Sequence, residues 1–256
     1  MKIYIKTKEE IEILREGGKR LATILAKVAE RVVPGVSTQA LDDYAYELIK
    51  AGGDEPAFLN YKPEGHAKAF PASLCTSVNS EVVHGIPRAD KILKEGDIIS
   101  IDLGLKHKGL FTDHAMTVGV GNVNRASQEL IGITREALLV GIEAAKCGNT
   151  VGDVGHAIEQ FVNRKYGIVR ELSGHGVGKY IHEDPFIPNF GKKGKGAKLV
   201  EGMVVAIEPM LNIGKADIVS MADGYTIKTA DGSRSAHFEH TILITNGEAE
   251  ILTIVS

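Results

Sequence analysis

The 256-residue sequence has few cysteines, little excess charge and no long apolar run. Its two cysteines, Cys75 and Cys147, cannot build a disulfide framework and suit a reducing compartment. A formal net charge of -3 offers no electrostatic basis for binding nucleic acid or an anionic membrane. No apolar stretch approaches the roughly 18 residues that a membrane helix needs, and the N-terminus lacks a signal-peptide pattern. We therefore expect a cytoplasmic protein that binds neither membranes nor nucleic acid directly.

Two well-separated segments carry the same pattern. "EGDIISID" (95–102) and "EGMVVAIE" (201–208) both begin with Glu-Gly, continue as an apolar, strand-like run and end on a carboxylate, Asp102 or Glu208. A His-x-x-Pro motif precedes each copy, as "HGIP" and "HEDP". The repetition indicates an internal duplication.

Apolar residues at helical spacing predict two pairs of helices, one pair ahead of each repeat. The expected ranges are 8–31, about 38–51, 128–148 and 151–166. Thr7 and Glu10 form a capping box at the start of the first helix.

The shared order of helix, helix, His-x-x-Pro and strand predicts an α+β fold, with central antiparallel sheets and helices outside. We expect a single catalytic domain, 1–256, made of two pseudo-symmetric halves at about 1–122 and 123–256. Asp102 and Glu208 would then face each other across an approximate two-fold axis.

A β-hairpin is predicted at 98–118, turning around "KHKG". Pairing Leu105 with Leu110 places Asp102 opposite Asp113, where like charges destabilise a sheet. Either these carboxylates lie on a solvent-exposed outer face of the sheet, or a cation lies between them.

Two further carboxylates and two histidines occur in strand-like or glycine-rich segments. Glu208 ends an almost continuous apolar run, so it requires a salt bridge or a metal if it is buried. Glu239 lies in "SAHFEHTILIT", which is either a surface strand or a second ligand strand. The glycine-rich stretch 173–185 holds His175 and His182, and its glycines disfavour a helix and allow close backbone approach.

Two patterns in or near this stretch are only weak signals of phosphate binding. The "GVGK" within the glycine-rich stretch lacks the first glycine and the Ser or Thr of a phosphate loop. The basic run "GKKGKGAK" (191–198) is more typical of a solvated loop than of a phosphate site.

Charge counting favours a dinuclear centre. The candidate ligands are Asp102, Asp113, His175, Glu208 and Glu239. Their four carboxylates would balance two divalent cations, with a neutral histidine as the nitrogen ligand. This oxygen-rich set suits Mn, Fe or Co ions, with Zn as a further candidate, and two such ions can activate water as a nucleophile.

Five motifs together resemble the type I methionine aminopeptidases of the pita-bread fold. They are "CTSVNSEVVHGIP", "IDLG…FTDHAMT", "SGHGVG…IHEDP", "VVAIEPM" and "FEHTILIT". The resemblance implies that the five candidate ligands hold two divalent metal ions and that His84 and His182 contact the substrate at the scissile peptide. It also implies that Cys75, Phe70 and Tyr225 line a methionine pocket.

Three features depart from the family pattern. Tyr225 stands where Trp is common, the segment 61–70 is longer than in the shortest members, and His237 replaces a residue that is often Gln. None of them touches the ligand set, but they bear on the shape of the pocket.

The resemblance implies a metal-dependent aminopeptidase that removes the N-terminal methionine from peptides and nascent proteins when the second residue is small. Glu208 would act as ligand and proton shuttle, His182 would stabilise the oxyanion, and His84 would assist the leaving nitrogen. We expect a monomer, with the ribosome as a candidate partner. Two alternatives are a proline-specific peptidase of the same fold, which usually carries an additional N-terminal domain, and a non-enzymatic module that binds peptides.

Overall fold

The computed structural model describes residues 2–255, and within them the chain forms four α-helices. The helices are α1 (Lys8–Ala29), α2 (Thr38–Ala51), α3 (Arg125–Ala144) and α4 (Val151–Val162). The predicted capping box is present, since the Thr7 hydroxyl accepts the Glu10 N–H and the Glu10 carboxylate accepts the Thr7 N–H. The prediction for α2 is confirmed at both ends.

The second pair of helices differs from the prediction at its ends. α3 begins at Arg125 instead of residue 128, because the Asn124 side chain accepts the Ser127 N–H and caps the helix before its apolar periodicity starts. It ends at Ala144 instead of residue 148. α4 ends at Val162 because Asn163 adopts a left-handed conformation, with φ 46°.

Within the described residues, nine strands form one large sheet, and six others form two three-stranded sheets. The large sheet has the order β1-β4-β5-β14-β9-β7-β8, with β2 also paired to β4 and β15 to β14. Its strands are β1 (Glu55–Pro56), β2 (Leu74–Val78), β4 (Ile98–His107), β5 (Leu110–Gly119), β7 (Ser173–Gly176), β8 (Glu183–Pro188), β9 (Val204–Ile207), β14 (Glu239–Leu243) and β15 (Glu250–Ile251). The smaller sheets contain β3 (Glu81–Val83), β6 (Gly167–Ile168), β10 (Met210–Asn212), β11 (Ile218–Ser220), β12 (Ile227–Thr229) and β13 (Ser235–His237).

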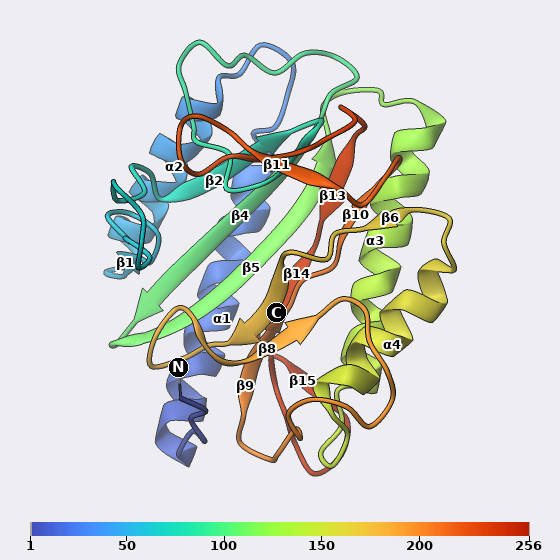
Figure 1. Cartoon of the computed structure of the whole chain (residues 1–256). Helices are drawn as coiled ribbons and strands as arrows, with labels where there is room; N and C mark the ends of the chain where they lie inside the picture. Colours follow the sequence, from blue (N-terminus) through green and yellow to red (C-terminus); the bar gives the residue numbers. More distant parts are fainter. Residues whose placement is uncertain (1, 256) are drawn as a thin grey trace.

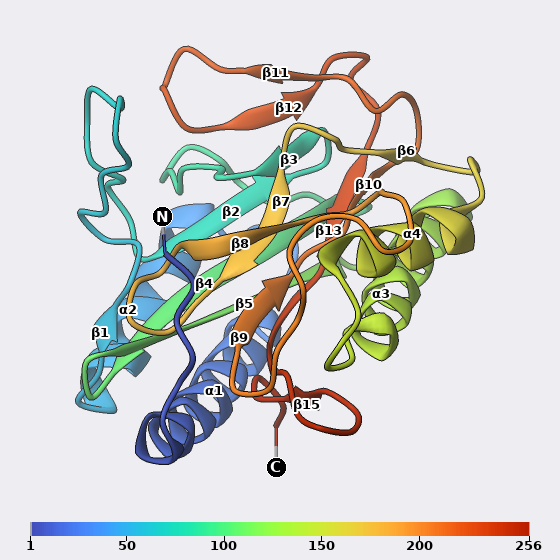
Figure 2. The same ribbon diagram turned by 60° about the horizontal axis from the view of Figure 1, so that its bottom comes forward.

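The helices cover one face of the large sheet (Figures 1 and 2). Leu21 and Leu25 of α1 belong to the same fully buried cluster as Ile99 and Ile101 of β4. A second cluster joins α3 and α4 to β9 and β14. Alternate residues of a strand point to opposite faces, so Asp102, between Ile101 and Leu103, points away from α1.

The β4–β5 hairpin has a different register from the predicted one. Asp102 lies opposite Ala115, and Asp113 lies opposite Gly104. The predicted Asp102–Asp113 pair is wrong because the turn contains two residues, Lys108 and Gly109, both with positive φ (46° and 87°). Such a turn suits the twist of a hairpin. It shifts the register by two residues, so the two aspartates stay on one face as diagonal neighbours.

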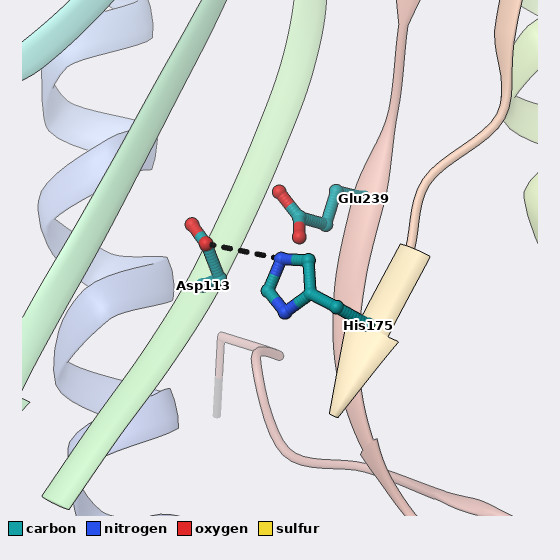
Figure 3. A group of neighbouring side chains, drawn as sticks. All are labelled: Asp113, His175 and Glu239. Atoms are coloured by element: carbon teal, nitrogen blue, oxygen red, sulfur yellow. Dashed lines mark ion pairs between the residues drawn. The ribbon is translucent and has the colours of Figure 1, made fainter. Parts of the chain in front are cut away.

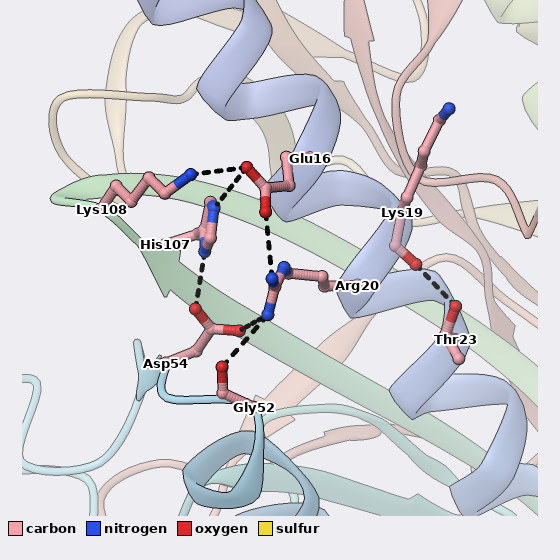
Figure 4. Close-up of polar contacts among 8 residues, drawn as sticks. All are labelled: Glu16, Lys19, Arg20, Thr23, Gly52, Asp54, His107 and Lys108. Atoms are coloured by element: carbon pink, nitrogen blue, oxygen red, sulfur yellow. Dashed lines mark hydrogen bonds and ion pairs between the residues drawn. The ribbon is translucent and has the colours of Figure 1, made fainter.

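Ion pairs attach the turn end of this hairpin to α1 (Figure 4). Lys108 Nζ lies 2.7 Å from the Glu16 carboxylate, which Arg20 also contacts at 3.0 Å. His107 Nδ1 lies 2.6 Å from Asp54 Oδ1. These contacts fix the long hairpin against the helix and therefore fix the position of its two aspartates.

Two other features bear on the expectations from the sequence. No helix within residues 2–255 combines the length and apolarity needed to cross a membrane. The lysines of 191–198 are exposed, and the loop lies against the start of α4, where Gly152 N–H donates to Lys195 O. This agrees with the solvated loop that we predicted.

Candidate active site

Each of five neighbouring strands brings one candidate ligand to the face of the sheet that the helices leave open. The strands are adjacent in the order β4, β5, β14, β9 and β7. They carry, in that order, Asp102, Asp113, Glu239, Glu208 (directly after its strand) and His175. The predicted set therefore comes together in space, although it spans much of the sequence.

Strand register places these side chains around a gap. Asp102 and Glu239 both lie opposite Ala115 of β5. Asp113 lies opposite Gly104, one row further along the same face. Because alanine occupies the position between Asp102 and Glu239, no long side chain from β5 fills the space between these two carboxylates.

The other side of the gap is built on β9 and β7. His175 lies opposite Ala206, which in turn lies opposite Thr241. A Cβ on Gly174 would come within 2.3 Å of the Ala206 carbonyl oxygen, so β7 can approach β9 this closely only with glycine there. This is the close backbone approach that the glycine-rich stretch predicted.

The functional atoms lie within a few ångströms of one another. One ligand atom from each of Asp113, His175 and Glu239 lies within 4.8 Å of the others (Figure 3). His175 Nε2 is 3.9 Å from Asp113 Oδ2 and 3.6 Å from Glu208 Oε1. The Gly176 carbonyl lies 2.9 Å from His175 Nδ1.

Burial and mutual repulsion make the carboxyl groups hard to ionise. Burial raises the pKa of Asp102 to about 7. Burial, followed by the neighbouring carboxylates, raises the pKa values of Asp113 and Glu239 well above their ordinary range. Asp102 Oδ1 and Glu239 Oε1 are buried without a hydrogen-bond partner. Cations would supply the missing partners and favour the ionised form, so the residues fit a divalent metal centre.

His84 and His182 line the same cavity of about 580 Å³ as the acidic cluster. Burial lowers the pKa of His84 to about 4 and that of His182 to about 3, so both rings are neutral at physiological pH. His84 has φ 57°, an uncommon backbone conformation that is often found at functional sites. The ring of His182 packs edge-on against His175, with centroids 4.5 Å apart.

The three predicted pocket residues lie together beside the acidic cluster. Cys75, Phe70 and Tyr225 line the same cavity and are buried. Phe70 meets the Tyr225 ring edge-on, with centroids 5.1 Å apart. Cys75 lies opposite Asp102 across β2 and β4, and burial raises the pKa of its thiol well above the ordinary value. An apolar, thiol-lined pocket thus adjoins the carboxylates.

The segment 61–70 contributes residues that the sequence analysis did not identify. The Tyr61 hydroxyl lies 2.9 Å from His182 Nδ1. The His66 ring packs against Tyr225, with centroids 4.9 Å apart, and the Tyr225 hydroxyl donates to Lys68 O at 2.6 Å. The extra length of this segment was the available signal, but length alone does not say which side chains turn inward.

A buried ion pair supports the turn that carries His182. Lys6 Nζ lies 2.5 Å from Glu183 Oε2, and both side chains are 1% exposed. The other Glu183 oxygen accepts the backbone N–H groups of Lys179 and Tyr180. The sequence analysis did not identify this pair, because the two residues belong to different elements.

The chain resembles known metallopeptidases over nearly its whole length. The model of metallopeptidase family M24 matches residues 12–246. A methionine aminopeptidase from Clostridium perfringens is 44% identical over 254 residues, which cover 99% of each chain. A crystal structure of methionine aminopeptidase from Thermotoga maritima has a TM-score of 0.94 and 44% identity, over 98% of this chain and 99% of that one.

A more distant match concerns the proline-specific alternative. A prolidase from Pyrococcus furiosus has a TM-score of 0.75 and 27% identity, and the match covers 66% of that longer chain. Together, the matches confirm the predicted α+β pita-bread architecture.

Proposed function

Because the chain belongs to metallopeptidase family M24, we propose that it is a methionine aminopeptidase that removes N-terminal methionine when the second residue is small. One observation carries the proposal. Five candidate ligands from five adjacent strands surround a cavity that also contains two neutral histidines and an apolar pocket. The full-length similarity to methionine aminopeptidases from Clostridium perfringens and Thermotoga maritima supports the same function.

We propose that the site holds two divalent ions of Mn, Fe, Co or Zn. The ligands would be Asp102, Asp113, His175, Glu208 and Glu239, whose four carboxylates would neutralise the charge of both ions. When bound, the ions would polarise the scissile carbonyl and activate water.

The protein's own groups would orient the substrate and move protons. Glu208 is the carboxylate at the rim of the cluster, with a side chain that is 12% exposed, and it would relay the proton of the attacking water to the leaving nitrogen. His182 would donate an N–H to the developing oxyanion, and His84 would donate near the scissile nitrogen. Each neutral ring has one N–H, so the proton must lie on the nitrogen that faces the substrate.

The first side chain of the substrate would enter the pocket of Cys75, Phe70 and Tyr225. Methionine suits this pocket because sulfur–aromatic contacts contribute about 0.3–1.5 kcal/mol each. We further propose that the substrates are N-terminal Met peptides and nascent chains, encountered in the cytoplasm and at the ribosome by a monomeric enzyme. Residues 1–122 and 123–256 would be the two halves of one catalytic domain, since each contributes a helix pair, the first adds two ligand strands and the second adds three.

The direct test compares two substrate classes with protein that has been loaded with Mn²⁺. We expect free methionine from Met-Ala peptides and no cleavage of Xaa-Pro dipeptides. Cleavage of Xaa-Pro dipeptides without methionine release would favour the proline-specific alternative. Peptide binding with no turnover of either class would favour the non-enzymatic one.

A further inference from the structure

Tyr61 and His182 form a contact that the proposed function does not use. The Tyr61 hydroxyl lies 2.9 Å from Nδ1 of His182, and the two rings are tilted with centroids 5.3 Å apart. Both residues line the candidate active-site cavity and a second cavity beside it, so the pair forms part of the wall between them. On its other side, the His182 ring packs against His175. The ring is therefore held from two directions.

The neighbouring His175 shows how a partner at Nδ1 determines the tautomer. A neutral imidazole carries one ring proton, on either Nδ1 or Nε2. The partner of His175 Nδ1 is the Gly176 carbonyl, 2.9 Å away, which can only accept. The proton of His175 therefore resides on Nδ1, and the lone pair of Nε2 faces the carboxylates, as a metal ligand requires.

His182 has a different partner at the same nitrogen. A phenol hydroxyl can donate, so Nδ1 of His182 can act as the acceptor. The Nδ1 partners of the two adjacent histidines therefore permit different tautomers.

We propose that Tyr61 is a positioning residue that donates its O–H to His182 Nδ1 and so holds the His182 proton on Nε2. In the reverse arrangement, Nε2 would carry no proton and could not donate to a developing oxyanion in the cavity that His182 lines. The adjacent histidines thus carry opposite tautomers, one as a ligand and the other as a donor.

The tautomer can be read without substrate, by nitrogen NMR of zinc-loaded protein carrying ¹⁵N-labelled histidine. We expect His182 to show a protonated Nε2 and an Nδ1 resonance displaced by an accepted hydrogen bond, with the reverse protonation at His175. Tyr61→Phe should remove the displacement of Nδ1 and allow the Nδ1–H form to appear. Tyr180→Phe is the matched control, because it removes an exposed hydroxyl at the second cavity and should leave both histidines unchanged. A wild-type His182 protonated on Nδ1, or an Nδ1 resonance that is unmoved in Tyr61→Phe, would overturn the proposal.

The kinetic consequence rests on the proposed function. Tyr61→Phe should lower kcat on a Met-Ala peptide by about 10- to 100-fold, with little change in KM, since an oxyanion donor is impaired. In a His182→Ala background the same substitution should have no further effect. If the NMR signature changes as expected and kcat does not, the assignment of Tyr61 stands and the oxyanion role of His182 fails. A failure of the Tyr61 proposal, seen by NMR, is thus distinguishable from a failure of the oxyanion role of His182, seen in kcat.

Discussion

Asp102 and Glu239 lie in register with the same residue, Ala115, on the strand between them. Ala115 is completely buried and belongs to the face that carries the two carboxylates. Its methyl group therefore lies between the two carboxylates, at the base of the space that metal ions would occupy. The geometry of the centre depends on this small residue as much as on the ligands.

Ala115→Val should reduce Mn²⁺ affinity at least tenfold, because two added methyl groups enter the gap between the carboxylates. Overpacking should also cost about 1–3 kcal/mol of unfolding free energy. Calorimetric titration and thermal unfolding measure the two effects. Ala137→Val, which overpacks the buried helix side of the protein, should lose stability without losing affinity. Equal Mn²⁺ affinity of Ala115→Val and wild type would show that the gap is not the metal site.

Chelation should abolish turnover, because it removes the ions that would polarise the scissile carbonyl and activate water. Mn, Fe or Co ions should restore activity, and rebinding should raise the melting temperature, since the ions bind the folded state. Methionine release is the assay, with metal content checked after dialysis. Full activity in protein shown to be metal-free would refute a metallopeptidase mechanism.

Asp102→Asn and Glu208→Gln should each lower kcat at least 100-fold while the protein stays folded. Each substitution removes one negative charge from the cluster but keeps the shape of the side chain. Circular dichroism checks the fold, and Asp90→Asn is the control because this exposed aspartate pairs with Arg88 at the surface. Turnover close to wild type in either site variant, at saturating metal, would mean that the ligands are misassigned.

The stability of the metal-free protein should depend on pH through Asp102. Its folded-state pKa of about 7 lies above the ordinary value of 3.8, so the folded state holds a proton that the unfolded state releases. This contribution is complete below about pH 4 and is lost as the pH rises through about 7. The buried histidines, whose pKa values are lowered, change the stability in the opposite direction as the pH rises. The contribution of Asp102 is therefore measured as the difference in unfolding free energy between wild type and an Asp102 variant.

Urea unfolding in chelator therefore compares wild type with Asp102→Asn at pH 5 and pH 8. Between pH 5 and pH 8, the difference in unfolding free energy between the two proteins should shift in favour of the variant, by a few kcal/mol at most. A difference that is the same at both pH values would contradict the assigned ionisation of Asp102.

The sequence predicted those parts of the molecule that depend on local patterns. The helices α1 and α2 follow from apolar spacing and caps, and the repeated Glu-Gly pattern places Asp102 in strand β4 and Glu208 directly after strand β9. The register of the β4–β5 hairpin did not follow, because it depends on Lys108 adopting a positive φ, which its residue type does not signal.

Contacts between distant segments were also beyond the sequence. Tyr61 and His182 are separated by 121 positions, and no periodicity links them. Lys6 and Glu183 are similarly remote, and each alone looks like an ordinary surface charge. Such pairs become visible only when the fold brings the segments that carry them together.

The central claim is tested most directly by a series of Met-X peptides, with X running from Gly to Arg, scored by free methionine from the Mn²⁺-loaded protein. The scissile bond would be held between His84, His182 and the carboxylate cluster, and a displacement of roughly 1 Å can cost about a hundredfold in rate. Only the first side chain has an apolar pocket, so nothing offsets the clash of a large second one. We predict rapid release when X is Gly, Ala, Ser, Thr, Pro or Val, and little release when X is Arg. Equal cleavage of Met-Ala and Met-Arg peptides would contradict the account.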